Sequence, residues 1–586
     1  MALRVPSDVA KSFVAEPIYQ FSEFERGLLK PFFTNPDRRV FFMHTFPAAV
    51  GDVLLAMYSR MKNPRGLRGT FLDQFLPGFL AVGLRETMEQ FDGDGAKFLK
   101  SRGITSLEKF LIYSNETRNA LAEFQLAFSL DPDYIQKFAA AAKVKKFLQM
   151  YLDAYGHNSI ARMATVWIGL EQISILAAKS IEWGRPGAGY IELSTRYVDM
   201  SGKGTYPIAE ELAAYGVNRD RVNKLVETSF DYYRHFQGED FNGPFPNFLR
   251  EKYGELYTDA PADLKTGVIG ETCDVLGNFL PACTLTSVGC AISGEALPEL
   301  VRHLRLDNTS ENFALADEIE REGEKLGLGQ FLRHTEISPW KEASWQYLTT
   351  EAREWIIAIQ RGRGVIEINL PSRDYVERAL LNSFQFQKRF GNCETWQDVL
   401  NILAQVPRNE HDKIPNHFEG ISASFGGEMS FRGWRDLHRM SFCTHYRTLL
   451  NPWIGFYRYD KPAVPEFPNA CRDLHYENKE FYREMVDCEV PEEMRQYPLA
   501  LGNLVGFIVS ANLSQFEFCG WQRTDWSVNH EVRQVFLGIE SLLRRAYPWW
   551  QELSEIAKNA EGEKDPRADM TPAYIFARGK RPIPLA

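Results

Sequence analysis

The sequence of 586 residues is short of the features that mark several large classes of protein. No two of its eight cysteines form a C-x-x-C pair, and they are spread from Cys273 to Cys519, so neither a disulfide framework nor a zinc ribbon is indicated. Basic residues are in the minority, with 67 Lys and Arg against 77 Asp and Glu and a net charge of −10. Because this balance lacks the cationic surplus that binds a nucleic-acid backbone, no nucleic-acid partner is expected.

Long apolar runs are missing as well. The chain begins MALRVP with no apolar stretch behind Arg4, so no signal peptide is visible. The most apolar run, residues 75–84, is about half the length that crosses a bilayer. With 44% hydrophobic and 25% charged residues, the composition is that of an ordinary globular protein. We therefore expect a cytoplasmic protein with no membrane partner.

Common catalytic and nucleotide-binding motifs are also missing from the sequence. His530 and Glu531 lack the second histidine of H-E-x-x-H, residues 184–189 do not form G-x-G-x-x-G, and no G-x-x-x-x-G-K-[ST] loop occurs. The eleven histidines show no metal-ligand spacing, so no metal is predicted.

Helical periodicity dominates what is present. Apolar residues recur at three- and four-residue steps over residues 131–155, 159–183 and 524–547, which predicts three long helices. Strand-like runs are few and short, as at 364–370 and 506–510. This mixture predicts an α+β fold that is rich in helix and has a small sheet.

A weak internal duplication is the main large-scale feature. Phe279-Leu-Pro281 precedes an amphipathic stretch that ends at Glu318, and Tyr497-Pro498 precedes one that ends at Glu531 at a similar separation. Upstream of each lies a helix that runs into an Arg-rich turn. We therefore predict two successive copies of one domain, the first with an N-terminal helical extension over 1–350 and the second, diverged, over 351–560. Residues 561–586 are polar with scattered prolines and are predicted to form a flexible tail.

One short segment gathers polar residues that suit a nucleotide. Glu192, Ser194 and Arg196 stand at alternate positions just after glycines, so in an extended chain they would line one wall. Arginine and serine bind phosphate oxygens, and glutamate accepts from a sugar hydroxyl or positions a water. The alternative is a solvated strand with an incidental Glu–Arg ion pair.

A second segment carries a cationic stripe. Arg432, Arg435 and Arg439 recur at helical steps beside His438. This set suits a diphosphate or the electron-rich edge of a flavin, although a surface face of ion pairs has the same pattern.

A third segment lies at the entrance to the C-terminal helix. Arg523 stands before Asp525 and Glu531, where it can reach into a pocket while Glu531 holds it in place. The alternative is an ordinary capped helix with a local ion pair.

Together these segments resemble a known family, the flavin-dependent thymidylate synthases. Glu192-Leu-Ser194-Thr-Arg196-Tyr197 resembles the end of the family signature R-H-R-x-x-S-x-N-E-x-S-x-R-Y. The turn at residues 156–159 is similar to the family's G-H-x-[ST] turn, and the path from Pro498 to Arg523 and Glu531 is similar to its C-terminal part. Most of residues 130–320 and 400–545 can be laid over two successive copies.

Each copy departs from the family pattern where the other keeps it. In the first copy Gly184-Arg185-Pro186 stands in place of R-H-R, and Ser310 in place of the C-terminal arginine. The second copy keeps His438-Arg439, but its positions for Glu, Ser and Arg are filled by His445, Arg447 and Leu449. Because the family builds each site between subunits of a tetramer, the pattern predicts one composite site at the junction of the halves. It also predicts a homodimer that imitates the tetramer.

The resemblance implies a chemistry and a set of roles. Members of the family methylate C5 of dUMP with reduced FAD and methylenetetrahydrofolate, and NADPH reduces the flavin, so the implied partner is a small pyrimidine nucleotide. The implied catalytic residue is Arg523, which would polarise the pyrimidine. The implied substrate-binding residues are Glu192, Ser194, Arg196, Arg435 and Arg495. The implied cofactor-binding residues are His157, Ser159, His438, Arg439 and Asn512.

A second function class stays open at this point. A flavin- or nucleotide-binding scaffold or sensor without methylase activity would also lose half of the signature from each copy, because such loss is what decay produces.

Overall fold

The computed structural model describes residues 5–30, 32–44, 54–55, 58, 63–75, 161–162, 164–182, 187–196, 198–326, 328–345, 364–386, 393–404, 412–440, 442–459, 463–524 and 528–554. The predicted helix at 131–155, the candidates His157 and Ser159, and the predicted tail lie outside these ranges. Within them, no helix is both long and apolar enough to cross a membrane.

The first half is built on a four-stranded antiparallel sheet with the order β1-β2-β4-β3. Its strands are β1 (Val40–Met43), β2 (Thr165–Ser174), β3 (Ala188–Glu192) and β4 (Leu285–Ser293). Its α-helices include α1 (Asp8–Ala15), α2 (Glu23–Leu29), α4 (Gly66–Thr70), α12 (Ile175–Ile181), α13 (Ile208–Ala213), α14 (Arg219–Gln237), α15 (Pro244–Tyr253), α16 (Pro261–Leu276), α17 (Leu297–Leu306) and α18 (Ser310–Lys325).

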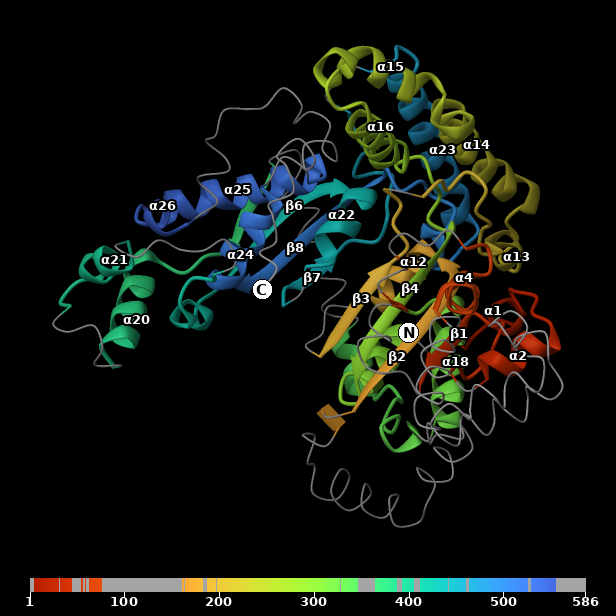
Figure 1. Ribbon diagram of the computed structural model, residues 1–586, viewed down its shortest axis with the longest axis horizontal. Coiled ribbons are helices and arrows are strands. Elements are labelled where there is room, and N and C mark those ends of the chain that lie inside the picture. Colours follow the sequence, from red (N-terminus) through yellow and green to blue (C-terminus); the bar gives the residue numbers. More distant parts are fainter. Residues whose placement is uncertain are drawn as a thin grey trace, which may run out of the picture.

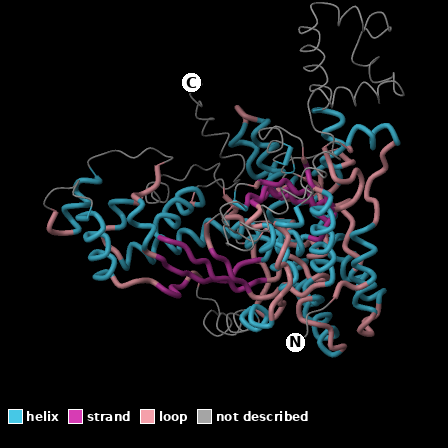
Figure 2. The backbone as a smooth tube through the Cα atoms, turned by 90° about the horizontal axis from the view of Figure 1, so that it is seen from below, coloured by secondary structure: helices cyan, strands magenta, loops and turns pink. Residues whose placement is uncertain are grey.

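The second half has a four-stranded antiparallel sheet with the matching order β5-β6-β8-β7. Its strands are β5 (Ile366–Asn369), β6 (Ser422–Ser430), β7 (Thr444–Arg447) and β8 (Leu504–Asn512). Its α-helices include α20 (Arg373–Phe386), α21 (Trp396–Ala404), α22 (Phe431–His438), α23 (Phe467–Asp487), α24 (Leu513–Arg523), α25 (His530–Ala546) and α26 (Trp550–Leu553). Figure 1 shows the two sheets in different parts of the molecule, with α14, α15, α16 and α23 gathered at one end. Figure 2 shows the strands in two separate groups among the helices.

The two halves repeat one path of the chain. In each, a long strand runs straight into a short helix, β2 into α12 and β6 into α22. The backbone N–H of the first helical residue then donates a hydrogen bond to the residue just before the second long strand, β4 or β8. Ile175 N donates to Thr284 O over 2.8 Å, and Phe431 N donates to Asn503 O over 3.1 Å. The predicted α+β fold with two similar helix-rich units is confirmed, while the division at residues 350 and 560 stays a prediction.

The end of the repeated stretch in the first half is Glu311 rather than Glu318. Ser174, the N-cap of α12, donates its hydroxyl to Glu311 over 2.6 Å and its backbone N–H over 2.9 Å. Ser430, the N-cap of α22, makes the same two bonds to Glu531, over 2.5 and 2.8 Å. Pairing Glu318 with Glu531 was wrong. The prediction compared distances along the sequence, and these do not align two copies whose loops differ in length. The residue eight positions before Glu311 is His303, so Ser310 is not the counterpart of Arg523.

The predicted helix at 159–183 was wrong over much of its length. Thr165–Ser174 form β2, and only Ile175–Ile181 are helical. β2 is a central strand that pairs with β1 on one side and with β4 on the other, and its side chains are mostly buried on both faces. Such a strand is apolar almost throughout, so its pattern does not differ from that of a buried helix. By contrast, the predicted helix at 524–547 is α25, and the predicted strands at 364–370 and 506–510 are β5 and part of β8.

The halves join along a short stretch of paired backbone. Ala282 N donates to Leu499 O over 2.9 Å, and Leu501 N donates to Leu280 O over 2.8 Å. One hydrophobic core cluster contains residues of both halves. Phe279 and Phe467 meet within it, with ring centres 5.4 Å apart. This joint places charged side chains of α12 and α22 within reach of each other.

Candidate functional site at the junction of the halves

Glu192, the last residue of β3, is the centre of a buried ion cluster at the junction. Its carboxylate lies 2.8 Å from Lys179 Nζ of α12 and 2.5 Å from Arg435 Nη2 of α22, and all three side chains are at most 3% exposed. Burial raises the pKa of Glu192, but the charges of Arg435 and Lys179 outweigh it and lower the pKa to about 2. The ionised carboxylate therefore links one helix from each half.

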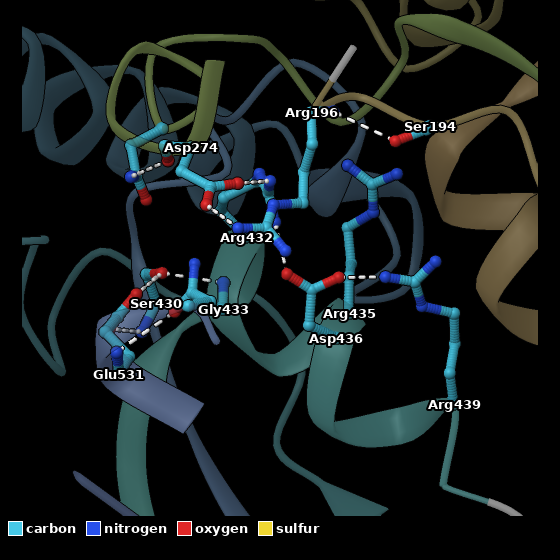
Figure 3. Close-up of polar contacts among 12 residues, drawn as sticks. Ser194, Arg196, Asp274, Ser430, Arg432, Gly433, Arg435, Asp436, Arg439 and Glu531 are labelled. Carbon is cyan, nitrogen blue, oxygen red and sulfur yellow. Dashed lines mark hydrogen bonds and ion pairs between the residues drawn. The ribbon is translucent and has the colours of Figure 1, made fainter. Parts of the chain in front are cut away.

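A second set of ion pairs crosses the same junction. Arg196 lies 2.9 Å from Asp274 of α16, and Asp274 lies 2.6 Å from Arg432 of α22. Arg432 in turn lies 2.9 Å from Asp436, which also pairs with Arg439. Figure 3 shows Arg196 directed toward the arginines and Asp436 of α22. Residues of both halves thus form a run of alternating charges.

Arg523, the last residue of α24, adjoins this run. Burial lowers the pKa of Arg523, and the charge of Asp436 opposes that effect. Arg439 and Arg196 also act on its pKa, so the guanidinium lies within electrostatic reach of groups from both halves. Glu531 does not hold it, contrary to the prediction. Glu531 accepts from Ser430 instead and so fixes the start of α22.

His438 of α22 stacks on the ring of Trp434 in the same helix and meets His445 of β7 edge-on. Its ring is 4.4 Å from that of Trp434, centre to centre, and 5.4 Å from that of His445. Burial lowers the pKa of His438 well below its usual range, and the neighbouring His445 and Lys179 lower it further. The imidazole is therefore neutral at pH 7.

Several buried donors of the junction have no hydrogen-bond partner within the described part of the chain. They are Arg435 Nε and Nη1, Arg523 Nε and Trp434 Nε1, and His438 Nδ1 is likewise unpartnered. Native proteins leave few buried polar groups without a partner, so such a group calls for an explanation. Cationic donors in this state suit an anionic ligand. The arrangement is thus able to hold an anion beside aromatic rings.

The cationic stripe was correctly predicted to be helical. The alternative, a surface face of ion pairs, does not describe its surroundings. Arg432 and Arg435 are buried rather than part of a solvated face. The stripe faces the other half of the chain, which supplies Asp274 to Arg432 and Glu192 to Arg435.

The extended wall predicted for residues 192–196 is present only in part. β3 ends at Glu192, and Thr195 and Arg196 lie in a turn. Ser194 Oγ accepts from the backbone N–H of Arg196 over 3.2 Å, so it stabilises this turn. Glu192 and Arg196 consequently reach the junction from different directions and contact different partners.

Two predicted residues are engaged elsewhere. Arg495 Nε donates to Val490 O over 2.7 Å, and its guanidinium lies 5.6 Å from the ring centre of Tyr482. Asn512 is the N-cap of α24 and accepts from Gln515 N over 2.8 Å. These contacts do not bring either residue into the ion clusters, so their proposed ligands rest on the resemblance alone.

Sequence reasoning missed two residues of the clusters, Lys179 and Asp274. Both lie among apolar residues of helices, α12 and α16, and both are buried. A charge inside an apolar helical stretch is the signal that could have found them, because such a charge is buried only when it is paired.

The second half does not reproduce the Glu192 position as the signature spacing predicted. Leu193 N donates to Ser287 O, and Thr448 N donates to Gly506 O, so the residues that precede them correspond. The counterpart of Glu192 is therefore Arg447, not His445. Its charge is reversed, and its guanidinium lies 4.8 Å from the ring centre of Phe431.

Comparisons with known proteins bear on the first half most directly. Residues 111–326 match the family model described as thymidylate synthase complementing protein. A UPF0159 protein of Chlamydia muridarum is 23% identical over 578 residues, which is 92% of this chain and 96% of that protein. A UPF0159 protein of Thermoplasma acidophilum is 28% identical over 447 residues, 67% of this chain and 85% of that protein.

Among solved structures, a UMP/dUMP methylase, PolB of Streptomyces cacaoi bound with 5-Br UMP, matches 33% of this chain and 94% of its own. The identity is 13% and the TM-score 0.26, so this likeness adds no argument about the site. The family match is the informative result, and it bears out the resemblance to the thymidylate synthase family over residues 111–326.

Proposed function

We propose that the chain is an enzyme that methylates C5 of a pyrimidine nucleotide such as dUMP, or adds a related one-carbon unit there. The observation that carries this proposal is the buried Glu192–Arg435 ion pair across the junction, with Arg523 of the second half within electrostatic reach of Arg196 of the first. A nucleotide needs ligands for its phosphate and a polarising group at its base. The resemblance assigns these to different halves, and the two sets adjoin at the junction.

Each residue has a role that its surroundings support. Arg196 would bind the phosphate, since its side chain keeps some exposure while Asp274 orients it. Arg523 would draw electron density from the pyrimidine ring, because a buried guanidinium polarises a carbonyl more strongly than an exposed one. Glu192 stays ionised beside Arg435 and would accept from a sugar hydroxyl.

The donor set also fits the diphosphate and ring of FAD. Arg435 and His438 carry buried nitrogens that lack a hydrogen bond in the described chain, and Trp434 supplies an aromatic face next to them. When bound, FAD reduced by NADPH would supply the hydride, and a folate would supply the one-carbon unit. Neutral His438 would donate or accept one hydrogen bond without adding charge, and Arg439 would offset the charge of the diphosphate.

A flavin assay tests the cofactor. The purified protein should be yellow and release FAD on denaturation, and the variants His438→Ala and Arg439→Ala should each retain less FAD. Arg483→Ala is the matched control, because Arg483 is half exposed and forms an ion pair with Glu480 of its own helix. A colourless protein that takes up no added FAD would contradict the cofactor assignment.

Binding of dUMP tests the composite site. Arg196→Ala and Arg523→Ala remove one cation from each half, and each should weaken dUMP binding by tenfold or more, because a charge-assisted hydrogen bond contributes about 1.5–3 kcal/mol. If both residues serve one ligand, the double variant should lose less than the sum of the two effects. If only one of the two folded variants bound dUMP more weakly than the wild type, this would argue against a shared site.

Turnover separates the enzyme from the scaffold. An enzyme should oxidise NADPH when dUMP and methylenetetrahydrofolate are added together. A protein that binds FAD and dUMP without turnover would be the non-catalytic scaffold or sensor instead.

We also propose that the two units divide near residue 350 and that the chain forms a homodimer in place of the family's tetramer. The matched strand order of the two sheets supports the first point, because each half then has the sheet of one complete unit. Light scattering would test the second, with a dimer mass as the expected result.

A further inference from the structure

Asp436 of α22 lies among the arginines of the junction, and the proposed function gives it no role. One oxygen of its carboxylate lies 2.9 Å from Arg432, the other pairs with Arg439, and the side chain is 13% exposed. Figure 3 shows both contacts. Burial raises the pKa of Asp436, but the charges of Arg432, Arg439 and Arg196 outweigh burial and lower the pKa far below its usual range. Asp436 is therefore a fixed negative charge.

The cations around Asp436 keep donors to spare. Arg523 also lies within electrostatic reach of the Asp436 carboxylate. Arg432 Nε, Arg435 Nε and Nη1, and Arg523 Nε are buried and have no hydrogen-bond partner among the residues that the structure describes. Asp436 thus offsets positive charge without using up the donors that carry it. Cationic donors left in this state suit a second anion.

The first half shows that the helix itself does not need an acidic residue here. Ser174 and Ser430 are the N-caps of α12 and α22, so Ser180 of α12 corresponds to Asp436 of α22. Ser180 is neutral and accepts a hydrogen bond from Asn312 over 3.1 Å. By the same register Leu176 corresponds to Arg432. The aspartate therefore accompanies the arginines of α22, and the shared helix forms without it.

A negative charge at this place acts in opposite directions with and without a bound anion. When no anion is bound, Asp436 offsets the mutual repulsion of guanidinium groups that lie close together. A bound phosphate would offset the same repulsion, and Asp436 would then repel that phosphate. The carboxylate thus takes the part of a ligand anion and opposes the ligand that replaces it.

We propose that Asp436 is an internal counterion that competes with the ligand phosphate for the arginines and so keeps anion binding at the junction weak and reversible. This inference rests on the proposed function, which assigns a nucleotide phosphate to Arg196. Arg439 is the arginine that this competition releases, because its side chain is 37% exposed and pairs with Asp436, whereas Arg432 also pairs with Asp274.

Calorimetric titration of the full chain at constant ionic strength tests the proposal, with inorganic phosphate and dUMP as probes. Asp436→Asn removes the charge and keeps the shape, so it should bind each probe at least tenfold more tightly than the wild type does. Deoxyuridine carries no phosphate, so its affinity should stay unchanged. Asp436→Glu keeps the charge and should bind inorganic phosphate as weakly as the wild type.

The direction of the change separates this role from a structural one. If Asp436 only held the arginines in place, Asp436→Asn would bind phosphate and dUMP more weakly. Asp8→Asn is the matched control, because it makes the same change in net charge at an exposed site of α1 and should leave phosphate affinity unchanged. Thermal unfolding adds a second measurement for a variant that is less stable. Phosphate should raise the melting temperature of Asp436→Asn more than that of the wild type, since it replaces the lost charge.

Phosphate affinity that is equal or weaker in Asp436→Asn would overturn the proposal, and so would equal stabilisation of the variant and the wild type by phosphate. Failure of the wild type to bind dUMP would instead contradict the proposed function. In that case the phosphate titration still decides the role of Asp436, because it needs no nucleotide.

Discussion

At the scale of single residues, Glu192 is the carboxylate on which the junction depends. It offsets Lys179 of one half and Arg435 of the other, and all three are buried. Removing one partner of a buried ion group leaves the others without compensation, which costs far more than an exposed ion pair contributes.

Glu192→Gln should therefore lower the free energy of unfolding by about 3–5 kcal/mol, because the buried Arg435 would lose its ion pair and Lys179 would keep only Glu182. Urea unfolding followed by circular dichroism measures the change. Lys11→Ala serves as the control, since Lys11 pairs with Asp8 at the surface, and its loss should change stability by less than about 0.5 kcal/mol. A Glu192→Gln variant as stable as the control would show that the cluster is not compensated as described.

Glu311 gives a prediction about pH. Burial raises the pKa of Glu311 to about 7, in spite of hydrogen bonds from Ser174 and Tyr497 that favour its charged form. The unfolded chain loses this proton at about pH 4.3, so the folded chain binds one more proton between that pH and about 7. The stability that this proton provides is complete below about pH 4 and is lost as the pH rises to about 7.

Glu311→Gln should remove this loss. Between about pH 4.5 and 7 the wild type should lose roughly 3 kcal/mol more of its unfolding free energy than the variant does, since each unit of pKa shift corresponds to about 1.4 kcal/mol. Urea unfolding at several pH values compares the two. Parallel pH profiles would mean that Glu311 titrates near its ordinary pKa in the folded chain.

At the scale of elements, the two strand-to-helix corners are the most closely repeated structures in the chain. Ser174 and Ser430 each cap a helix and bond to a glutamate of a distant helix, α18 or α25. Each corner thus combines a local cap with a long-range contact.

Ser430→Ala and Ser174→Ala should both lower the free energy of unfolding by about 1–3 kcal/mol, because each loses a cap and leaves a buried glutamate with one partner fewer. Ser22 caps α2 at the surface, so Ser22→Ala provides a matched control with a smaller effect of about 1 kcal/mol or less. Thermal melting of the three variants gives the comparison. Equal effects for all three would indicate that the glutamates contribute nothing beyond the cap.

The same elements show how far the sequence predicts the fold. The amphipathic helix α25 was predictable because it has one buried face, and β5 and part of β8 were predictable from short β-branched runs between turn residues. β2 was predicted as a helix, because a central strand covered on both faces has no alternation of polar and apolar residues. Periodicity reports burial on one face, and it fails where both faces are covered.

The candidate site was predictable for a different reason. Glu192, Arg196, Arg435 and Arg523 stood out by their residue types within short motifs. In the structure Glu192 pairs with Arg435 across the junction, and Arg196 lies within electrostatic reach of Arg523. Lys179 and Asp274 did not stand out, because their role appears only when α12 and α16 pack against the other half. Pairing across a junction depends on the fold, and neither composition nor spacing contains it.

At the scale of the whole molecule, the two halves are packed together along one joint. Backbone hydrogen bonds between Ala282 and Leu499 and between Leu501 and Leu280 join them like a short stretch of sheet, and a single apolar cluster contains residues of both. Ion pairs from Asp274 and Glu192 to α22 are buried at the same joint. An interface of this kind resembles a core, so each half alone would expose apolar side chains and unpaired charges.

Separating the chain near residue 350 should therefore give two fragments, 1–350 and 351–586, that associate when they are produced together and copurify in equal amounts. Each fragment alone should aggregate or lack a cooperative unfolding transition, because buried charges of α22, α16 and β3 would lose the partners that lie across the joint. Asp274→Ala in the first fragment should reduce copurification, since Arg432 would lose its partner across the joint, whereas Asp8→Ala, at an exposed site of α1, should not. Two fragments that fold separately and do not associate would contradict the view that the joint is part of one core. They would also contradict the composite site, because that site needs both halves held in register.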